Sequence, residues 1–315
     1  MSGPVVAVVG PTATGKSDLG VALALALGGE VVNADAMQLY RGMDIGTAKV
    51  TDAERRGVPH HQLDVLEVEE DASVAAYQRA ARADVEAITG RGLRAVVVGG
   101  SGLYVRALLD RMELAPVDPE VRAQLEARAE AEGTGVLHDE LAALDPAAAS
   151  TIGRQNTRRV VRALEVITLT GRPWTASLPE QEYVRPAVQL GLDCDRAVLD
   201  ERVARRVERM WDRGLVAEVV GLAPRLGRTA RRAVGYAEVL AALRGERTLD
   251  DARAGVVAGT RRLARKQMGW FGRDPRVHWL DAQDPDLVGR ALDLVAQADD
   301  GRLADPGSRR RTLGS

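Results

Sequence analysis

The chain has 315 residues, of which 28% are charged, and a formal net charge of −2, so it is too balanced overall to be a polybasic nucleic-acid-binding protein. Its length allows two domains, or one domain that carries an insertion. The only cysteine, Cys194, excludes an internal disulfide. No 18-residue apolar run is present for a membrane span, and the N-terminus lacks the charged region of a signal peptide, so we expect a cytoplasmic protein.

The most distinctive segment comes first, at residues 10–17, where the sequence matches the P-loop pattern G-x-x-x-x-G-K-[ST]. A β-branched apolar run at 5–9 predicts a buried strand before it, and residues 18–27 can form a helix after it. In such a strand–turn–helix unit, backbone N–H groups converge on an anion, and the lysine adds a positive charge. A glycine-rich turn without a ligand is the alternative. The predicted phosphate-binding residues are Gly10, Pro11, Thr12, Ala13, Thr14, Gly15, Lys16 and Ser17, with the Ser17 hydroxyl as the metal ligand.

Strands and helices alternate through residue 109. The strand expected at 93–98 is apolar without alternation, as in a strand buried on both faces of a parallel sheet. This alternation predicts an α/β fold with a parallel sheet. Another strand is expected at 30–33, helices after Ser73 and at 103–109, and loops at 39–51 and 59–64.

The composition changes in the middle of the chain. Residues 113–145 are acidic and alanine-rich, and Asp118-Pro119 supplies a capping residue followed by proline at the first helical position. We predict that 113–145 form a small helical insertion in a P-loop α/β core of residues 1–112 and 146–298. The tail, 299–315, has little to bury and is expected to be disordered. Further helices are expected at 154–170, 199–243, 248–271 and 286–296, and strands at 187–192 and 277–280.

Two polar residues follow strands of the predicted sheet. Asp35 follows the second strand and Ser101 the third, so both lie at the carboxyl edge, where parallel sheets bind ligands. Asp35 is a candidate general base, and the alternative is that it caps the next segment. Ser101 is a candidate hydrogen-bonding group, and the alternative is a tight turn that serine caps. No acid follows the third strand, which weakens the case for ATP hydrolysis, because P-loop enzymes use such an acid to hold magnesium.

Arginines recur at helical spacing in the second half of the chain. Arg202, Arg206 and Arg209 fall on one face of an expected helix, and Arg158 and Arg159 lie on another helix. A charged helix face is usually solvated surface, but near a P-loop it can also bind a diphosphate or an RNA backbone. The aromatic residues that follow other arginine clusters can stack on a base or pack in the core. They are Tyr236, Trp270 and Phe271.

Seven sequence blocks follow one another between residue 5 and about residue 280. The longest, Asp35–Lys49, reads Asp-Ala-Met-Gln-Leu-Tyr-Arg-Gly-Met-Asp-Ile-Gly-Thr-Ala-Lys and is far more specific than a P-loop alone. The others are 10–17, Pro59–His61, Gly99–Tyr104, Asn156–Arg159, Ala233–Tyr236 and Thr260–Gln267. In content and order these blocks resemble the tRNA isopentenyltransferase family, which contains the bacterial tRNA dimethylallyltransferases.

The resemblance implies a P-loop NTPase-like parallel sheet with a helical insertion near the tRNA anticodon, and it implies a prenyltransferase. Enzymes of this family transfer the dimethylallyl group of dimethylallyl diphosphate to N6 of adenosine 37 in tRNAs that read codons beginning with U, with Mg²⁺. The products are N6-dimethylallyladenosine and diphosphate. The P-loop, an ATP- and nucleotide-binding motif elsewhere, would here hold the leaving diphosphate. The implied partners are the anticodon stem-loop of tRNA and dimethylallyl diphosphate, and we expect a monomer.

The resemblance also gives roles to residues of this sequence. It implies that Asp35 is the catalytic base and that Ser101, Lys16 and Arg206 are catalytic, with Arg202 as the second choice for the arginine that holds the diphosphate. Ser101 stands where the family usually has threonine and keeps the hydroxyl. Ala36 stands where the family usually has serine, so a side-chain contact to tRNA is lost there. The implied tRNA-binding residues are Asp35, Ala36, Met37, Gln38, Arg122, Gln155, Asn156, Thr157, Arg158, Arg159, Arg232, Ala233, Val234, Gly235 and Tyr236.

Two other functions remain open at this point. An ATP-dependent small-molecule P-loop kinase would need an acid after the third strand, and the sequence has Gly99-Gly100-Ser101 there. A non-catalytic RNA-binding regulator would need basic charge, but it would need neither a complete P-loop nor Asp35.

Overall fold

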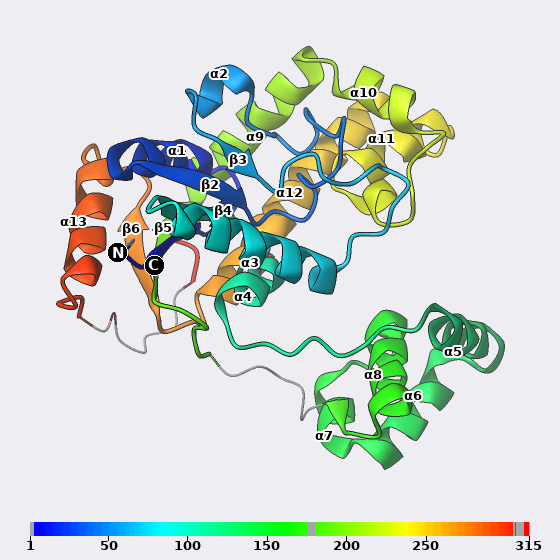
Figure 1. The fold of residues 1–315 in the computed structure, drawn as a ribbon. Coiled ribbons are helices and arrows are strands. Elements are labelled where there is room, and N and C mark those ends of the chain that lie inside the picture. The colour runs from blue at the N-terminus through cyan, green and yellow to red at the C-terminus, as the bar shows by residue number, and fades with distance from the viewer. Residues whose placement is uncertain (1–2, 175–180, 305, 307–311, 315) are drawn as a thin grey trace. The chain divides into compact units, whose positions relative to one another are not determined.

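The computed structural model describes residues 3–174, 181–304, 306 and 312–314. The chain forms two compact units (Figure 1), one made of Met1–Leu109 with Tyr183–Ser315 and the other of Asp110–Glu182. The first unit holds a six-stranded sheet, and the second unit is helical. Among the described residues, no helix is both long and apolar enough to cross a bilayer.

The sheet confirms the predicted parallel α/β fold, because every neighbouring pair of strands is parallel. The strand order is β3-β2-β4-β1-β5-β6, which places the strand before the P-loop near the middle. The edge strand β3 (His60–His61) was not predicted, because two half-buried histidines give no apolar pattern. The other strands are β1 (Val5–Val9), β2 (Gly29–Asn33), β4 (Arg94–Gly99), β5 (Ala187–Asp193) and β6 (Val277–Asp281).

Alternate residues of β1 enter different cores, since successive side chains of a strand point to opposite faces. Val5, Ala7 and Val9 pack in the core that includes residues of α3 and α4. Val6 and Val8 pack in the core formed with α1 and α13, on the other face of the sheet (Figure 1). The strand is therefore buried on both sides, which explains its continuous apolar sequence. The helices are α1 (Lys16–Leu27), α3 (Val74–Gly90), α4 (Gly102–Leu109) and α13 (Leu287–Asp299).

The remaining helices of this unit match the sequence prediction only in part. The single helical stretch expected at 199–243 is broken at Gly214 and Gly235, which both adopt the left-handed φ values that glycine tolerates, 94° and 97°. The pieces are α9 (Arg196–Asp212), α10 (Leu215–Leu222), the 3-10 helix η2 (Ala230–Arg232) and α11 (Tyr236–Leu243). The other two helices are α12 (Leu249–Phe271) and the short α2 (Asp52–Arg55), which lies between the two segments predicted as loops, at 39–51 and 59–64, and was not predicted.

The helical unit is larger than the insertion predicted at 113–145. It extends over Asp110–Glu182 because the apolar face of α8, with Val160 and Leu164, packs against Leu137 of α6 instead of against the sheet. The amphipathic pattern of α8 shows that it has an apolar face, but it does not show which core that face enters. The helices of this unit are α5 (Pro119–Glu132), α6 (Thr134–Leu144), α7 (Pro146–Thr151) and α8 (Thr157–Thr170).

The prediction of a disordered tail at 299–315 falls partly on residues outside the described chain. Of the described ones, Asp299 ends α13 and forms an ion pair with Arg94 at 2.8 Å. Leu313 packs in the small cluster that contains the buried Cys194. The tail prediction is wrong for these two residues, which contact the core.

Gly99, the last residue of β4, tests how tightly the sheet edge is packed. A β-carbon there would lie 2.3 Å from the backbone carbonyl oxygen of Ala34, and backbone cannot move aside cheaply. We predict that Gly99→Ala lowers the free energy of unfolding by about 1–3 kcal/mol. Gly90, at the end of α3, has no neighbour within 4 Å of such a carbon, so Gly90→Ala is the matched control and is expected to stabilise by up to about 1 kcal/mol. Urea denaturation measures both, and equal effects would contradict the packing argument.

Candidate active site

A cavity of about 860 Å³ lies in the larger unit, at the carboxyl ends of the central strands. Parallel sheets bind ligands at this edge, because the loops that follow the strands converge there. Its walls are formed by the P-loop, the segments that follow β2 and β4, and one face of α9. The residues that line it include Thr12, Lys16, Ser17, Asp35, Gln38, Gly100, Arg206 and Gln267.

The P-loop has the backbone of an anion site. Gly10 and Gly15 adopt φ values of 129° and 90°, and a β-carbon on Gly10 would lie 2.6 Å from the carbonyl oxygen of Leu192. Helix α1 begins at Lys16, and no described side chain caps its N-terminus. Its first amide N–H groups are therefore available to an anion, in addition to the positive end of the helix dipole.

Two cations of this site share the same small space. The Lys16 ammonium donates to the carbonyl oxygen of Pro11 at 2.6 Å, and Arg206 Nη1 donates to Thr12 Oγ1 at 3.2 Å. Burial, followed by the repulsion from Arg206, lowers the pKa of Lys16 to about 7, although Asp35 acts in the opposite direction. Burial also lowers the pKa of the Arg206 guanidinium, again opposed by Asp35. Two half-buried cations whose charged forms are both disfavoured by burial are an electrostatic arrangement that an anion would relieve.

The arginine that contacts the P-loop is Arg206. The sequence left Arg202 as the second choice. Arg202 lines the cavity, but within the described chain its side chain donates no hydrogen bond to the P-loop.

Asp35 is held by its own strand. The side-chain amide of Asn33, the last residue of β2, accepts from the Asp35 N–H at 3.0 Å and donates to the Asp35 carbonyl at 3.0 Å. Asp35 Oδ1 accepts from the N–H of Met37 at 3.0 Å, so the predicted alternative of a local cap occupies one carboxylate oxygen. No described residue donates to Oδ2, which leaves this oxygen for a ligand. Sequence reasoning missed Asn33, although a polar residue that ends an apolar strand was a signal.

Ser101 joins the segments that follow two neighbouring strands. Its Oγ accepts from the N–H of Ala36 at 3.2 Å, which connects the end of β4 to the residue after Asp35. The hydroxyl keeps its own proton and a second lone pair for a ligand. The capping alternative for this serine side chain is therefore not what the structure shows.

One of the two glycines before Ser101, Gly100, leaves room for a side chain of α12. A β-carbon on Gly100 would lie 2.3 Å from Nε2 of Gln267, a buried side chain of α12. Oε1 of the same glutamine accepts from the N–H of Thr12 in the P-loop at 2.8 Å. The close approach predicted for these glycines thus involves α12. Gln267 ends one of the sequence blocks that resemble the family, but its role in the site was not predicted.

The predicted tRNA-binding residues of the larger unit divide by exposure. Of the aromatic candidates, Tyr236 and Phe271 are 0% and 2% exposed, so the alternative of packing in the core holds for these two rings; Ala233 is buried as well. Trp270 keeps 40% of its surface exposed. Gln38 lines the cavity near Asp35. The exposed Arg232 ends η2, while Val234 and Gly235 lie between η2 and α11.

In the helical unit, Arg122 forms an internal ion pair, at 2.6 Å, with Glu165, whose side chain is fully buried. Asn156 caps α8 by accepting from the N–H of Arg159. These contacts stabilise the helical unit. The exposed residues at the start of α8 are Gln155, Thr157, Arg158 and Arg159.

The parallel sheet, the P-loop and the paired cations define a P-loop α/β protein whose site suits a phosphorylated ligand. A family model described as IPP transferase matches residues 38–274, and the chain belongs to this family. A tRNA dimethylallyltransferase of Streptomyces griseus is 58% identical over 300 residues, which cover 93% of this chain and 96% of that protein. One of Kineococcus radiotolerans is 60% identical over 308 residues, which cover 94% and 97%. The resemblance predicted from the sequence is confirmed.

Solved structures agree with the family. The tRNA isopentenylpyrophosphate transferase of Bacillus halodurans superposes with a TM-score of 0.69 at 39% identity, covering 96% of this chain and 97% of that one. A eukaryotic dimethylallyltransferase described as acting on tRNA superposes with a TM-score of 0.83 at 25% identity, covering 96% of this chain and 80% of that one. The fold is therefore shared over nearly the whole length of this chain.

The depressed pKa of Lys16 leads to a prediction about stability. Because the folded-state pKa is about 7 and the unfolded value is 10.5, the unfolded chain binds a proton that the folded chain lacks between these pH values. The cost is largest below pH 7 and shrinks as the pH rises toward 10.5. We predict that Lys16→Met, without ligand, raises the free energy of unfolding by roughly 2–4 kcal/mol at pH 6.5 and by less at pH 9.5.

Melting temperatures at the two pH values measure this effect. Lys266→Met is the matched control, because this lysine is exposed on α12 and should change little at either pH. A Lys16→Met protein that melts below the unsubstituted protein at pH 6.5 would contradict the electrostatic argument.

Proposed function

We propose that this protein transfers the dimethylallyl group of dimethylallyl diphosphate to N6 of adenosine 37 in tRNAs that read codons beginning with U. The relatives named tRNA dimethylallyltransferase support the reaction, and the structure described as acting on tRNA supports the acceptor. The observation that carries the proposal is the meeting of Lys16, Arg206 and Asp35 in one cavity. Cations suit a leaving diphosphate, and a carboxylate suits the proton of the attacking amine.

The P-loop side of the cavity binds the leaving group. When N6 attacks carbon 1 of the donor, the bond between that carbon and the diphosphate oxygen breaks, and the electron pair leaves with the diphosphate. The charge on this oxygen grows during the step, so preorganised cations and N–H groups lower its barrier. Lys16, Arg206 and the uncapped amides of α1 supply them.

Magnesium fits this site as a companion of the diphosphate. Mg²⁺ takes hard oxygen ligands and is commonly bound by one or two protein groups together with substrate phosphates and water. The Ser17 hydroxyl, at the start of α1, is the protein ligand that we propose. The described residues contain no group of three or more His, Cys, Asp and Glu that could hold a metal by themselves. Bound magnesium would supply further positive charge for the leaving group.

Asp35 faces the acceptor in this proposal. Oδ2, which no described residue occupies, takes the proton that N6 loses as the new carbon–nitrogen bond forms. Ser101 Oγ, anchored on the N–H of Ala36, is the group that hydrogen-bonds to the amine. The adenine must leave the stack of the anticodon loop to reach these atoms, as is general for enzymes that act on a base. Every side chain in these steps comes from one copy of the chain, so we propose a monomer.

An ATP-dependent kinase fits the site less well. Phosphoryl transfer in P-loop enzymes uses a carboxylate on a strand next to the P-loop to hold magnesium. β4, which pairs with β1, is followed instead by Gly100 and Ser101, and the nearby space is filled by Gln267.

The reaction is tested directly with purified protein, magnesium chloride, labelled dimethylallyl diphosphate and unmodified tRNA that carries adenosine at position 37. We expect label in the tRNA, and none in a matched tRNA with guanosine at that position. Transfer of phosphate from labelled ATP to a small molecule, or tRNA binding without any transfer, would overturn the proposal.

The base role of Asp35 gives a sharper prediction. We expect Asp35→Asn to lower kcat by about 10²–10⁴-fold, because proton removal from the amine is lost, while KM for each substrate changes by less than about threefold. Steady-state kinetics with both substrates varied measures this. Asp52→Asn, which alters a carboxylate that is 97% exposed on α2, is the control and should leave kcat unchanged. An Asp35→Asn enzyme that keeps half of the kcat would refute the assignment.

A further inference from the structure

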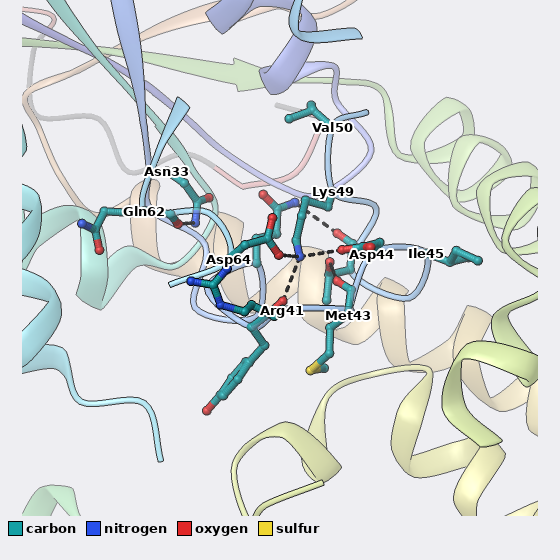
Figure 2. Close-up of polar contacts among 12 residues, drawn as sticks. Asn33, Arg41, Met43, Asp44, Ile45, Lys49, Val50, Gln62 and Asp64 are labelled. Carbon is teal, nitrogen blue, oxygen red and sulfur yellow. Dashed lines mark hydrogen bonds and ion pairs between the residues drawn. The ribbon is translucent and has the colours of Figure 1, made fainter. Parts of the chain in front are cut away.

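The turn formed by residues 44–49, here called the recognition turn, is built around a buried lysine. The side chain of Lys49 is 3% exposed, and its ammonium group donates to Asp44, to Asp64 and to the carbonyl oxygen of Tyr40 (Figure 2), at 2.6, 2.5 and 2.8 Å. An ammonium group has three N–H donors, so all of them are used within the protein. Although Lys49 lies at the cavity, it is therefore unlike Lys16 and fixes the chain instead of a ligand.

A second anchor holds the same turn from α10. The carboxylate of Glu218 accepts from the N–H groups of Asp44, Ile45 and Gly46 at 3.0, 2.7 and 2.9 Å. Consecutive amides that converge in this way form a nest for an anion, and here the protein's own carboxylate fills it. The hydroxyl of the buried Tyr236 donates to the same carboxylate.

The recognition turn in turn fixes the side chain of Gln38. Nε2 of Gln38 donates to the carbonyl oxygens of Thr47 and Ala48, at 3.1 and 3.4 Å. Because the nitrogen of the amide faces these carbonyls, its oxygen is the atom left for the cavity that Gln38 lines. Within the described chain, this oxygen accepts no hydrogen bond.

We propose that Lys49 and Glu218 are positioning residues for Gln38: by anchoring the recognition turn, they keep its amide oxygen directed at the acceptor base, so that the site selects a base with an exocyclic amine. The inference rests on the proposed function, since it concerns the base that enters the same cavity. An amide oxygen accepts a hydrogen bond from the exocyclic amine of adenine. Guanine and hypoxanthine carry a carbonyl oxygen at that position, and the lone pairs of two facing oxygens repel each other. If the turn relaxes, the amide can rotate and present its NH₂ group, and the preference disappears.

Binding assays with anticodon stem-loops test this without requiring catalysis. Fluorescence anisotropy compares a stem-loop with adenosine at position 37 with one that has inosine there. We expect the unsubstituted protein to prefer adenosine by about three- to tenfold, the value of one hydrogen bond. Lys49→Met and Glu218→Ala should reduce this ratio to less than about twofold, as should Gln38→Ala. KM for dimethylallyl diphosphate should not change, because none of these residues contacts the P-loop.

Two comparisons separate positioning from a general structural effect. Glu218→Gln keeps one acceptor oxygen in the nest and should retain part of the preference that Glu218→Ala loses. Glu208→Gln, which removes an exposed carboxylate of α9 that pairs with Arg253, is the matched control and should leave the ratio unchanged. Should Lys49→Met fail to fold, the Glu218 series decides, because this side chain is less buried.

The outcomes distinguish this inference from the proposed function. If the unsubstituted protein prefers adenosine and modifies it, but folded Glu218→Ala keeps the full ratio, the positioning role is overturned and the function stands. If the unsubstituted protein prefers adenosine and Glu218→Ala does not, the positioning role is supported, whether or not a dimethylallyl group is transferred. A failure to transfer that group would overturn the proposed function and leave the positioning role in place.

Discussion

The burial of two cations, Lys16 and Arg206, beside the P-loop is the physical constraint around which the site is built. Within the described chain, neither side chain forms an ion pair with a carboxylate, although both are half-buried beside the P-loop. Half-buried charges without a partner cost folding free energy, and a protein keeps them where function requires them. The sheet beneath them is buried on both faces, and the free energy of folding that this burial contributes offsets the cost of the buried charges.

The sheet also explains how residues far apart in sequence converge. β2 and β4 are neighbours, so the residues that follow them, Asp35 and Ser101, lie at the same edge. Backbone and side-chain bonds then tie the two segments together through Ala36, while Asn33 fixes the backbone of Asp35. Gln267 joins the P-loop to α12 in the same way. The catalytic groups that we propose thus sit on a network of hydrogen bonds with little freedom, which suits chemistry that depends on position.

Local signals in the sequence predicted much of this structure. The P-loop was found because its turn demands particular residues at fixed spacing, and the apolar strands were found because burial on both faces leaves a continuous run. The end of the helical unit was not predicted, because the apolar face of α8 fits either core equally well in sequence. Tyr236 illustrates the same limit, since an aromatic ring beside arginines looks similar whether it stacks on RNA or holds a carboxylate.

Contacts across long stretches of sequence had no signal at all. Glu218 lies far along the chain from the amides that it binds, and Gln267 is further still from Thr12. Nothing in the spacing of either residue distinguishes it from an ordinary helix position. The role of a residue that holds a site in place is therefore harder to predict than the role of one that carries out its chemistry. Lys49 and Gln267 both lie in blocks of the family pattern, but the sequence does not show which atoms they bind.

The unpaired cations also determine whether the ligand-bound or the ligand-free protein unfolds more easily. A ligand that binds only the folded state stabilises it in proportion to the logarithm of its concentration over its dissociation constant. In the function that we propose, a diphosphate bound beside Lys16 and Arg206 offsets their buried positive charge and makes the chain harder to unfold. The protein without a ligand is then expected to be more open to proteolysis than the protein that holds its donor or its product.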